Sequence, residues 1–444
     1  MKKLLFIGLV LPWSALFAQE DLSLSRAIEI GLENNFDIQI SRQNESIAER
    51  NNSWGEAGIF PTVDLQLQGA LSTTNIDNPA SFLQGDISSR DLTPSASLNW
   101  TLFNGFNVRM TKDRLSLLEY QTVGNTAILI ENSIQAIILA YNTVLLEESR
   151  LDVFENTFSL SRDRYAYSQL KGDLGSSVTF DILQDKTAYL TDSSNYLSQQ
   201  LNHRNAVREL NILLNVDIDK TWNYTGELEA EPKDYVLDEL SAKMTANNSN
   251  LKNQYINQEI LRKDVGIARS SMYPRLDVAS GYSRNQQTQD LSSARFGNGE
   301  SGDSGIKSTT TNYFANFTLA FTIFNGGRIR RQIENAKVQE QIGNLQVEQL
   351  KLTLNRDLAS GYETYDLRKN LYNISEINLE AAQLNLSLAE ERYQNGTINS
   401  FDYRDLQITY LQTALTNLQS RFDLISSDME LMRLTGGILN ITEQ

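Results

Sequence analysis

The chain has 444 residues, of which 55 are acidic and 39 basic, with one histidine and no cysteine, so its formal net charge is −16. This composition excludes zinc fingers, disulfide frameworks, Cys-His nucleophiles and multi-histidine metal sites, and we expect no cofactor. A Ser-His-Asp triad would depend on His203, whose polar surroundings are typical of a helix surface. The negative charge argues against nucleic acid as a partner, because duplex binding needs clustered Lys and Arg.

Residues 1–18 have the features of a secretory signal peptide. Lys2 and Lys3 precede an apolar run, and small residues follow up to Ala18. We expect cleavage after Ala18, with Leu16 in place of the small residue usual three positions before the cleaved bond. The mature chain would carry a formal charge of 37 − 55 = −18. No cysteine follows the cleavage site, so no lipoprotein-type anchor is expected.

No segment beyond the signal peptide is a run of uninterrupted apolar residues long enough for a membrane helix, which needs about 18. The most apolar stretch, 127–146, contains Glu131 and several amides, and we interpret it as a helix buried by other helices. An exported chain of this kind can enter a membrane only through β-strands.

Long helices are favoured where proline is absent. Residues 95–231 and 275–444 contain no proline, which is the strongest helix breaker. Within 328–393 apolar side chains recur at intervals of three and four residues. A helix of about 65 residues would be roughly 100 Å long, which no compact globular domain needs.

Three landmarks occur twice and indicate an internal duplication. They are Phe60-Pro61 with Tyr273-Pro274, Leu102-Phe103-Asn104-Gly105 with Ile323-Phe324-Asn325-Gly326, and Phe180-Asp181 with Phe401-Asp402. The offsets are 273 − 60 = 213, 323 − 102 = 221 and 401 − 180 = 221, so the spacing is constant after one insertion of 8 residues.

The duplication divides the chain into a signal peptide (1–18), a first repeat (19–227) and a second repeat (228–444). Each repeat is predicted to run helix, strand, loop, strand, very long helix, turn, long helix. The predicted strands cover about 61–72, 93–104, 274–284 and 311–324, and the predicted helical-hairpin tips lie near 172–181 and 395–405. Residues 215–237 break the helical pattern between the repeats.

The predicted strands alternate apolar and polar residues, as in the segment 63–68. This period of two is typical of membrane barrel strands with a lipid-facing exterior and a wet lumen, and a half-buried sheet of a soluble protein has it as well. Aromatic residues where the strands start and end favour the barrel, because aromatic side chains collect at the membrane interface. These rim aromatics are Phe60, Tyr273, Phe103 and Phe324.

Four strands cannot close a barrel, and an open sheet edge in lipid leaves backbone groups unpaired. At least two copies are therefore required, since the smallest membrane barrels have about 8 strands. A rotational trimer would give 3 × 4 = 12 strands. The polar loops at about 72–91 and 284–310 are expected on the side facing away from the cell.

In the order, duplication and spacing of these landmarks, the sequence resembles the outer membrane efflux protein (TolC-type) family. The resemblance also includes Arg392-Tyr393-Gln394-Asn395-Gly396 followed by Ser400-Phe401-Asp402, and it covers the chain from Leu22 to about Leu439. It implies a homotrimer whose 12-stranded β-barrel in the outer membrane continues into a periplasmic α-helical barrel.

The resemblance further implies a passive exit duct rather than an enzyme. Such a duct belongs to a tripartite efflux or type I secretion system, and its partners are outer membrane lipid, a periplasmic adaptor (membrane fusion protein) and an inner-membrane pump. It lies in the outer membrane and spans into the periplasm. By the same resemblance, residues 215–237 belong to a belt of irregular structure around the helical barrel.

The predicted hairpin tips contain turn and capping residues. Gly175 and Gly396 can supply left-handed turns, and Thr179 and Ser400 can be helix N-caps. By resemblance these tips are the docking region for the adaptor. Asp181 and Asp402 fall in the first turn of their helices. A carboxylate there stabilises the helix because it lies near the positive end of the helix dipole, so a purely structural role is the alternative for both residues.

By resemblance, Asp402 and Asp405 face the axis of the trimer and form a constriction ring of 2 × 3 = 6 carboxylates that favours cations. Tyr393 and Asp181 match positions that hold neighbouring hairpins together in the closed state. Ile398 stands where a basic residue can assist this latch.

The first hairpin differs from the second in one respect. Arg164-Tyr165 lies 16 residues before Phe180, whereas Arg392-Tyr393 lies 9 residues before Phe401. Either the first hairpin is longer by a heptad or Arg164-Tyr165 is not the counterpart.

Two other functions are weighed against the duct. A secreted hydrolase could use the pair Asp402 and Asp405, but nothing else in the sequence forms a pocket around them. A coiled-coil structural or adhesive surface protein would keep the helices, but it has no use for two matched strand pairs.

Overall fold

The structure, a computed structural model of the chain, describes residues 20–174 and 179–438. The predicted signal peptide (1–18) and Gly175 lie outside these residues. The chain packs into two compact units. The helical unit comprises Met1–Arg42, Asn125–Lys252 and Leu350–Gln444, and the sheet unit comprises Gln43–Gly124 and Asn253–Gln349.

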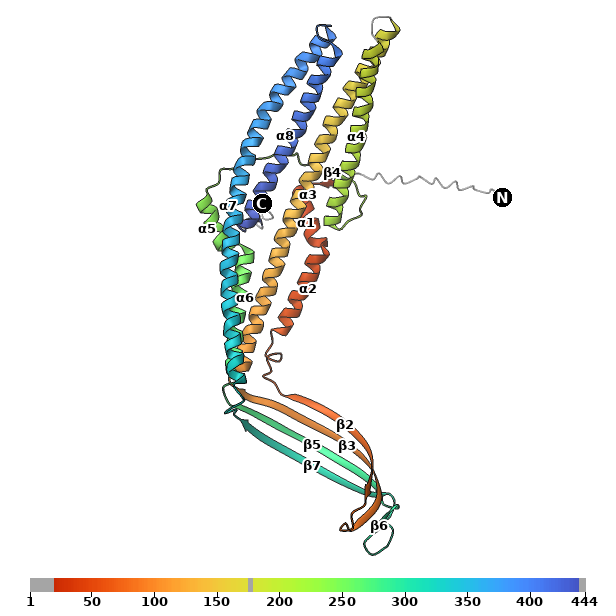
Figure 1. The fold of residues 1–444 in the computed structure, drawn as a ribbon, viewed down its shortest axis with the longest axis vertical. Coiled ribbons are helices and arrows are strands. Elements are labelled where there is room, and N and C mark those ends of the chain that lie inside the picture. Colours follow the sequence, from red (N-terminus) through yellow and green to blue (C-terminus); the bar gives the residue numbers. More distant parts are fainter. Residues whose placement is uncertain (1–19, 175–178, 439–444) are drawn as a thin grey trace, which may run out of the picture. The chain divides into compact units, whose positions relative to one another are not determined.

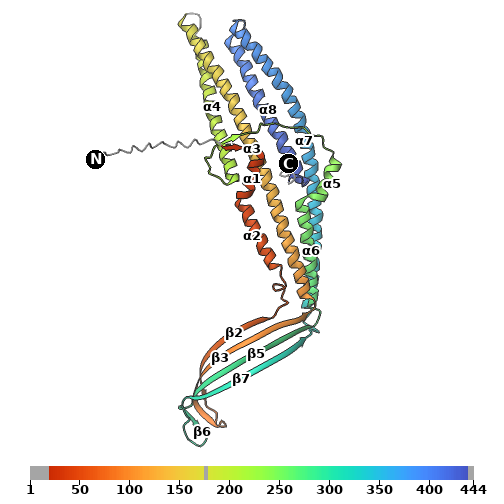
Figure 2. The ribbon, with the colours of Figure 1, turned by 180° about the vertical axis from the view of Figure 1, so that it is seen from behind.

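Long helices account for most of the described chain (Figure 1). They are α1 (Leu24–Asn34), α2 (Phe36–Asn51), α3 (Asn107–Asp173), α4 (Thr179–Leu214), α5 (Leu237–Asn247), α6 (Ser249–Ser270), α7 (Arg328–Gln394) and α8 (Ser400–Leu434). The long helix predicted over 328–393 is confirmed as α7, which has 67 residues. In both views α3 lies beside α4, and α7 lies beside α8 (Figures 1 and 2).

Corresponding helices of the two halves start at the same two offsets, 213 and 221, that separate the repeated sequence landmarks. The starts of α1 and α5 differ by 237 − 24 = 213, and those of α3 and α7 by 328 − 107 = 221. The ends of α3 and α7 also differ by 394 − 173 = 221. Because both helices have 67 residues, the first hairpin has no extra heptad in α3. The counterpart of Arg392-Tyr393 is Lys171-Gly172 (392 − 221 = 171), not Arg164-Tyr165.

The main core of the helical unit forms around the middle of α3. Its buried residues Ile134, Ile137, Ile138 and Tyr141 recur at intervals of three and four, so they share one helix face. This face packs on Leu210 and Leu214 of α4 and on two short strands. The strands, β1 (Glu20–Leu22) and β4 (Trp222–Tyr224), pair in parallel. Sequence patterning missed this sheet because three-residue strands are too short to show a period.

Among the described helices, only α3 contains an 18-residue segment apolar enough to cross a membrane by composition, with a mean hydropathy of 1.4. Of this segment 44% is buried inside the structure. Residues such as Ile137 and Val144 are core residues. The apolar stretch 127–146 therefore packs one face into the core of the helical unit, and the prediction of a buried helix is confirmed only for that face.

The sheet unit contains four long strands in the order β2-β3-β5-β7, with all neighbours antiparallel. They are β2 (Thr62–Ile76), β3 (Leu83–Asn104), β5 (Arg275–Asp290) and β7 (Ile306–Ala320), and a short strand β6 (Ala294–Phe296) pairs with β3. The strand β3 begins at Leu83, earlier than the predicted 93, because the backbone ladder continues through polar residues. The strand β7 ends at Ala320, earlier than the predicted 324, so Phe324 lies in the turn that follows.

The strand register confirms the predicted alternation. Leu65, Ala96, Tyr282 and Tyr313 are paired across the four strands in one row. The next row consists of Gln66, Ser95, Ser283 and Asn312. Side chains of successive rows point to opposite faces, so the sheet has one apolar and one polar face. The apolar face is uncovered in the single chain, with Leu65 84% exposed.

Candidate functional site

Two equivalent Asn-Gly turns connect the sheet to the long helices. The side-chain oxygen of Asn104 accepts a hydrogen bond from the Val108 amide at 3.4 Å, and that of Asn325 accepts one from Ile329 at 3.4 Å. The following glycines have nearly identical left-handed backbones, with φ of 67° at Gly105 and 68° at Gly326. A left-handed residue after an asparagine reverses the chain at low cost only when it is glycine, which explains why the Phe-Asn-Gly landmark occurs twice.

The four rim aromatics differ in their surroundings. Phe60, Tyr273 and Phe324 are exposed, whereas Phe103 is half-buried. The ring of Phe106 contacts Phe103 edge-on at 5.3 Å and Tyr273 at 6.2 Å between centroids. The sequence analysis missed Phe106, which has a left-handed φ of 68° and corresponds to Gly327 in the second repeat (327 − 106 = 221). No sequence pattern signals such a conformation for phenylalanine.

The second hairpin tip is a glycine turn closed by an asparagine cap. Gly396 has φ of 71°, as predicted for a left-handed turn residue. The N-cap of α8 is Asn399, whose side-chain oxygen accepts a hydrogen bond from the Asp402 amide at 2.8 Å. The prediction of Ser400 as N-cap is therefore wrong by one residue, because the amide oxygen of asparagine reaches the third residue onward equally well. Thr179 is the first described residue of α4.

The two predicted ring carboxylates, Asp402 and Asp405, are both exposed on α8 in the single chain. Asp402 lies in the first turn of the helix, where the dipole favours a negative charge. Whether they meet at an axis depends on further copies of the chain, so the ring stays a prediction.

Tyr393 lies between aromatic rings near the end of α7. It stacks on Tyr403 with ring centroids 4.9 Å apart and contacts Tyr167 edge-on at 6.5 Å. Burial raises the pKa of the Tyr393 phenol above its usual value. Asp181 is exposed near the start of α4, and no contact joins it to Tyr393 within the part of the chain that the structure describes. The latch between these two residues stays a prediction.

A buried polar network, which we call the hairpin network, joins the first helical hairpin to the second. Arg164 of α3 lies with its Nε 2.9 Å from Oδ1 of Asp185 on α4, and the two side chains are only 2% and 1% exposed. Ser400 of α8 donates a hydrogen bond to the same carboxylate oxygen at 2.7 Å. Arg164 also donates to Gln407 of α8 at 2.7 Å. Asp185 therefore has partners on both hairpins.

A second ion pair extends the hairpin network along α4. Arg404 of α8 donates two hydrogen bonds of 2.7 Å to the carboxylate of Asp192, and the Asp192 side chain is 2% exposed. Burial lowers the pKa of the Arg164 guanidinium, and the nearby Asp185 carboxylate opposes this shift. A bidentate pair such as that of Arg404 with Asp192 fixes the geometry of the contact as well as pairing the two charges.

The hairpin network was missed by the sequence analysis, although a signal exists. Asp185, Asp192 and Gln199 recur every seven residues on α4, and all three are buried. A heptad of polar residues along a helix interface marks a polar seam between helices. Among the described residues, no group of three or more His, Asp or Glu side chains is positioned to hold a metal ion.

Comparison with known proteins places this geometry in a family. Residues 240–437 match the model of the outer membrane efflux protein family. A solvent efflux pump outer membrane protein, SrpC of Pseudomonas putida, is 22% identical over 441 residues, covering 96% of this chain and 87% of its own. Residues 240–437 of this chain are therefore an outer membrane efflux protein domain. The predicted family, function class and outer-membrane localisation are thereby confirmed.

Solved structures of outer membrane channels share the fold. The CmeC outer membrane channel of Campylobacter jejuni has a TM-score of 0.73 at 17% identity, and the match covers 95% of this chain and 88% of that one. VceC of Vibrio cholerae has a TM-score of 0.68 at 18% identity, over 93% and 96% of the two chains. The predicted combination of long helices with a β-domain is the fold of these channels.

Proposed function

We propose that three copies of this chain form a passive exit duct through the outer membrane. The observation that carries this proposal is the open four-stranded sheet with its uncovered apolar face. Its edge strands, β2 and β7, have no partner on their outer sides among the described strands. In lipid each unpaired backbone group costs several kcal/mol, and three copies pairing β7 with β2 of the next copy would give 3 × 4 = 12 strands.

The duct takes its energy and its substrates from partners. A channel of this kind has no need of catalysis, so we propose that the chain is not an enzyme. It would receive cargo from an inner-membrane pump through a periplasmic adaptor that docks at the hairpin tips, including Thr179, Gly396 and Ser400. The relative SrpC is described as part of a solvent efflux pump, which makes small apolar compounds the first cargo to test.

Within this duct we propose that the hairpin network holds the aperture closed. Asp185 contacts Ser400 and Arg164, so it links the two helical hairpins of one copy. Tyr393 stacks on Tyr403 of α8, and Ser400 and Asp185 of the network lie close enough to influence its pKa. If the hairpins separate when the aperture opens, water must hydrate these buried groups. A substitution that weakens the contacts therefore favours the open state.

The test is the oligomeric mass of the detergent-extracted protein together with its conductance in a planar lipid bilayer. A conducting trimer is the expected result. A soluble monomer without conductance would contradict the duct and favour the alternative, a coiled-coil structural or adhesive surface protein.

A further inference from the structure

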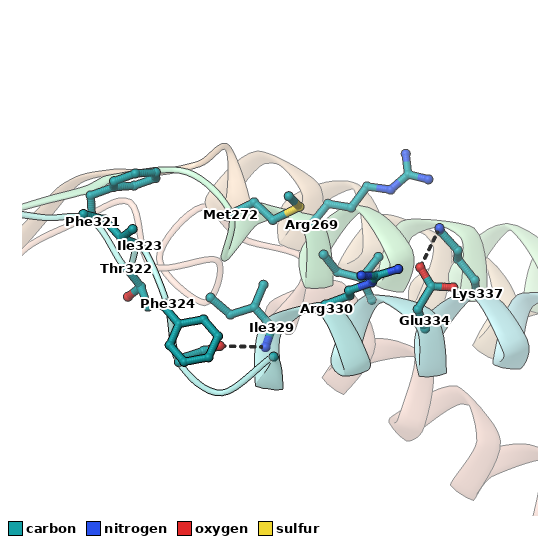
Figure 3. A pocket seen from close by; sticks show the side chains of 13 residues that line it. Arg269, Met272, Phe321, Thr322, Ile323, Phe324, Ile329, Arg330, Glu334 and Lys337 are labelled. Atoms are coloured by element: carbon teal, nitrogen blue, oxygen red, sulfur yellow. Dashed lines mark hydrogen bonds and ion pairs between the residues drawn. The ribbon is translucent and has the colours of Figure 1, made fainter.

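A cavity of about 530 Å³ opens in the sheet unit where the end of α6, the start of α7 and the turn after β7 meet (Figure 3). Part of its lining is apolar and comes from Met272, Phe321, Ile323 and Phe324. The four side chains are all exposed in the single chain, although they are large and apolar. Such a surface is costly in water unless something covers it.

The charged part of the lining is mainly cationic. It contains Arg269, Arg330, Lys337 and Glu334, and Glu334 pairs with Lys337 at 3.0 Å. Among the described residues no acidic side chain forms an ion pair with Arg269 or Arg330. In addition, α7 has no acidic residue in its first turn, so the positive end of its dipole is not compensated there. The cavity therefore carries excess positive charge in a chain whose net charge is −16.

The cavity lies just beyond the end of β7, a strand that carries part of the apolar face. Phe317 and Leu319 of β7 belong to the apolar face, being paired with Val278 and Leu276. Phe321 continues their alternation and lines this cavity. The intervening Ala320 lines an adjoining, more polar cavity of about 590 Å³ together with Arg275 and Arg328. The two cavities share Thr322, Asn325 and Ile329 in their linings.

We propose that the first cavity binds an anionic phospholipid, with its phosphate held by Arg269 and Arg330 and an acyl chain lying along Phe321 and Ile323. A ligand must satisfy the cations and cover the apolar side chains at once, and an anionic lipid does both. Basic residues beside an aromatic rim are a recurring way to hold lipid headgroups. The proposal rests on the placement of the sheet in the outer membrane, and it adds a defined lipid site to that placement.

The test uses the delipidated full-length oligomer in non-ionic detergent, titrated with phosphatidylglycerol or with phosphatidylcholine of the same acyl chains. Native mass spectrometry counts the bound lipids. The expected result is preferential binding of phosphatidylglycerol, weakened about fivefold by Arg269→Gln and by Arg330→Gln, since each cation near a lipid surface contributes about 1 kcal/mol. Arg328→Gln is the matched control, because it removes the same charge from α7 at the other cavity.

Three results would overturn the proposal. They are equal binding of the two lipids, an equal loss in Arg328→Gln, and displacement of phosphatidylglycerol by inorganic phosphate at similar concentration, which would identify a free anion as the ligand. The trimer mass and conductance are recorded on the same samples. A conducting trimer without lipid preference contradicts only the lipid site, whereas a non-conducting monomer contradicts the duct.

Discussion

The substitution Asp185→Asn tests the hairpin network most directly. It removes the charge that faces Arg164 while keeping the size of the side chain, so a guanidinium that is 2% exposed is left without its counter-ion. Removing one partner of a buried ion pair typically costs about 3–5 kcal/mol. If opening hydrates this site, the cost falls on the closed state alone. The closed-to-open ratio then decreases by roughly two to three and a half orders of magnitude.

The assay is single-channel conductance of the purified oligomer in a planar bilayer. Asp163→Asn is the matched control, because it makes the same change in an exposed Arg–Asp pair on α3, next to Arg164 but outside the hairpin network. Arg164→Met combined with Asp185→Asn removes both charges, so it is expected to open the channel less than Asp185→Asn alone. Wild-type conductance in Asp185→Asn, or an equal increase in Asp163→Asn, would refute the reasoning.

Four further outcomes are expected. Leu65→Arg places a charge on the apolar face at a cost of about 2–4 kcal/mol and should reduce membrane-assembled trimer, whereas Gln66→Arg on the polar face should not. Gly105→Ala should lower the thermal midpoint more than Gly326→Ala. Both substitutions meet the penalty of about 1–2 kcal/mol for a left-handed backbone, but only Gly105→Ala brings a Cβ within 2.3 Å of the Ser270 carbonyl oxygen. Burial raises the pKa of Glu131, so the stabilisation by this residue is complete below the ordinary glutamate pKa and is lost as the pH rises through the pKa of the folded state. Glu131→Gln should therefore raise the thermal midpoint at pH 7 but not at pH 4, as thermal scans would reveal. Asp402→Asn with Asp405→Asn should raise the half-blocking concentration of a trivalent cation on the order of tenfold in bilayer recordings, and unchanged block would exclude a carboxylate ring.

The long elements could be predicted from the sequence because their patterns are long. The three- and four-residue spacing over 328–393 persists for many turns, and α7 has the expected extent. The alternation in 63–68 likewise identifies the face of β2 on which Leu65 lies. A pattern that repeats many times tolerates individual exceptions.

Element ends and pair contacts were harder to predict. Asn399 and Ser400 are both good caps, and sequence alone does not say which one folds into that role. The length of β3 depends on backbone pairing that polar residues support as well as apolar ones. The contact between Arg164 and Asp185 depends on the rotation of α3 against α4, which no single-helix pattern specifies. Resemblance to the family predicted a latch of Tyr393 and Asp181 near the hairpin tips, which stays a prediction. The buried contact between Asp185 and Ser400 in the same region was not predicted.

The buried residues of α3 change character along the helix. From Ile134 to Leu146 they are almost all apolar, whereas the buried residues Thr157, Ser161, Arg164 and Ser168 are all polar. Apolar contacts resist separation in water, but polar ones exchange protein partners for water with a much smaller net change in free energy. One continuous helix is therefore held by apolar contacts at its middle and by polar contacts toward its far end, so we expect any separation of the hairpins to begin at the far end.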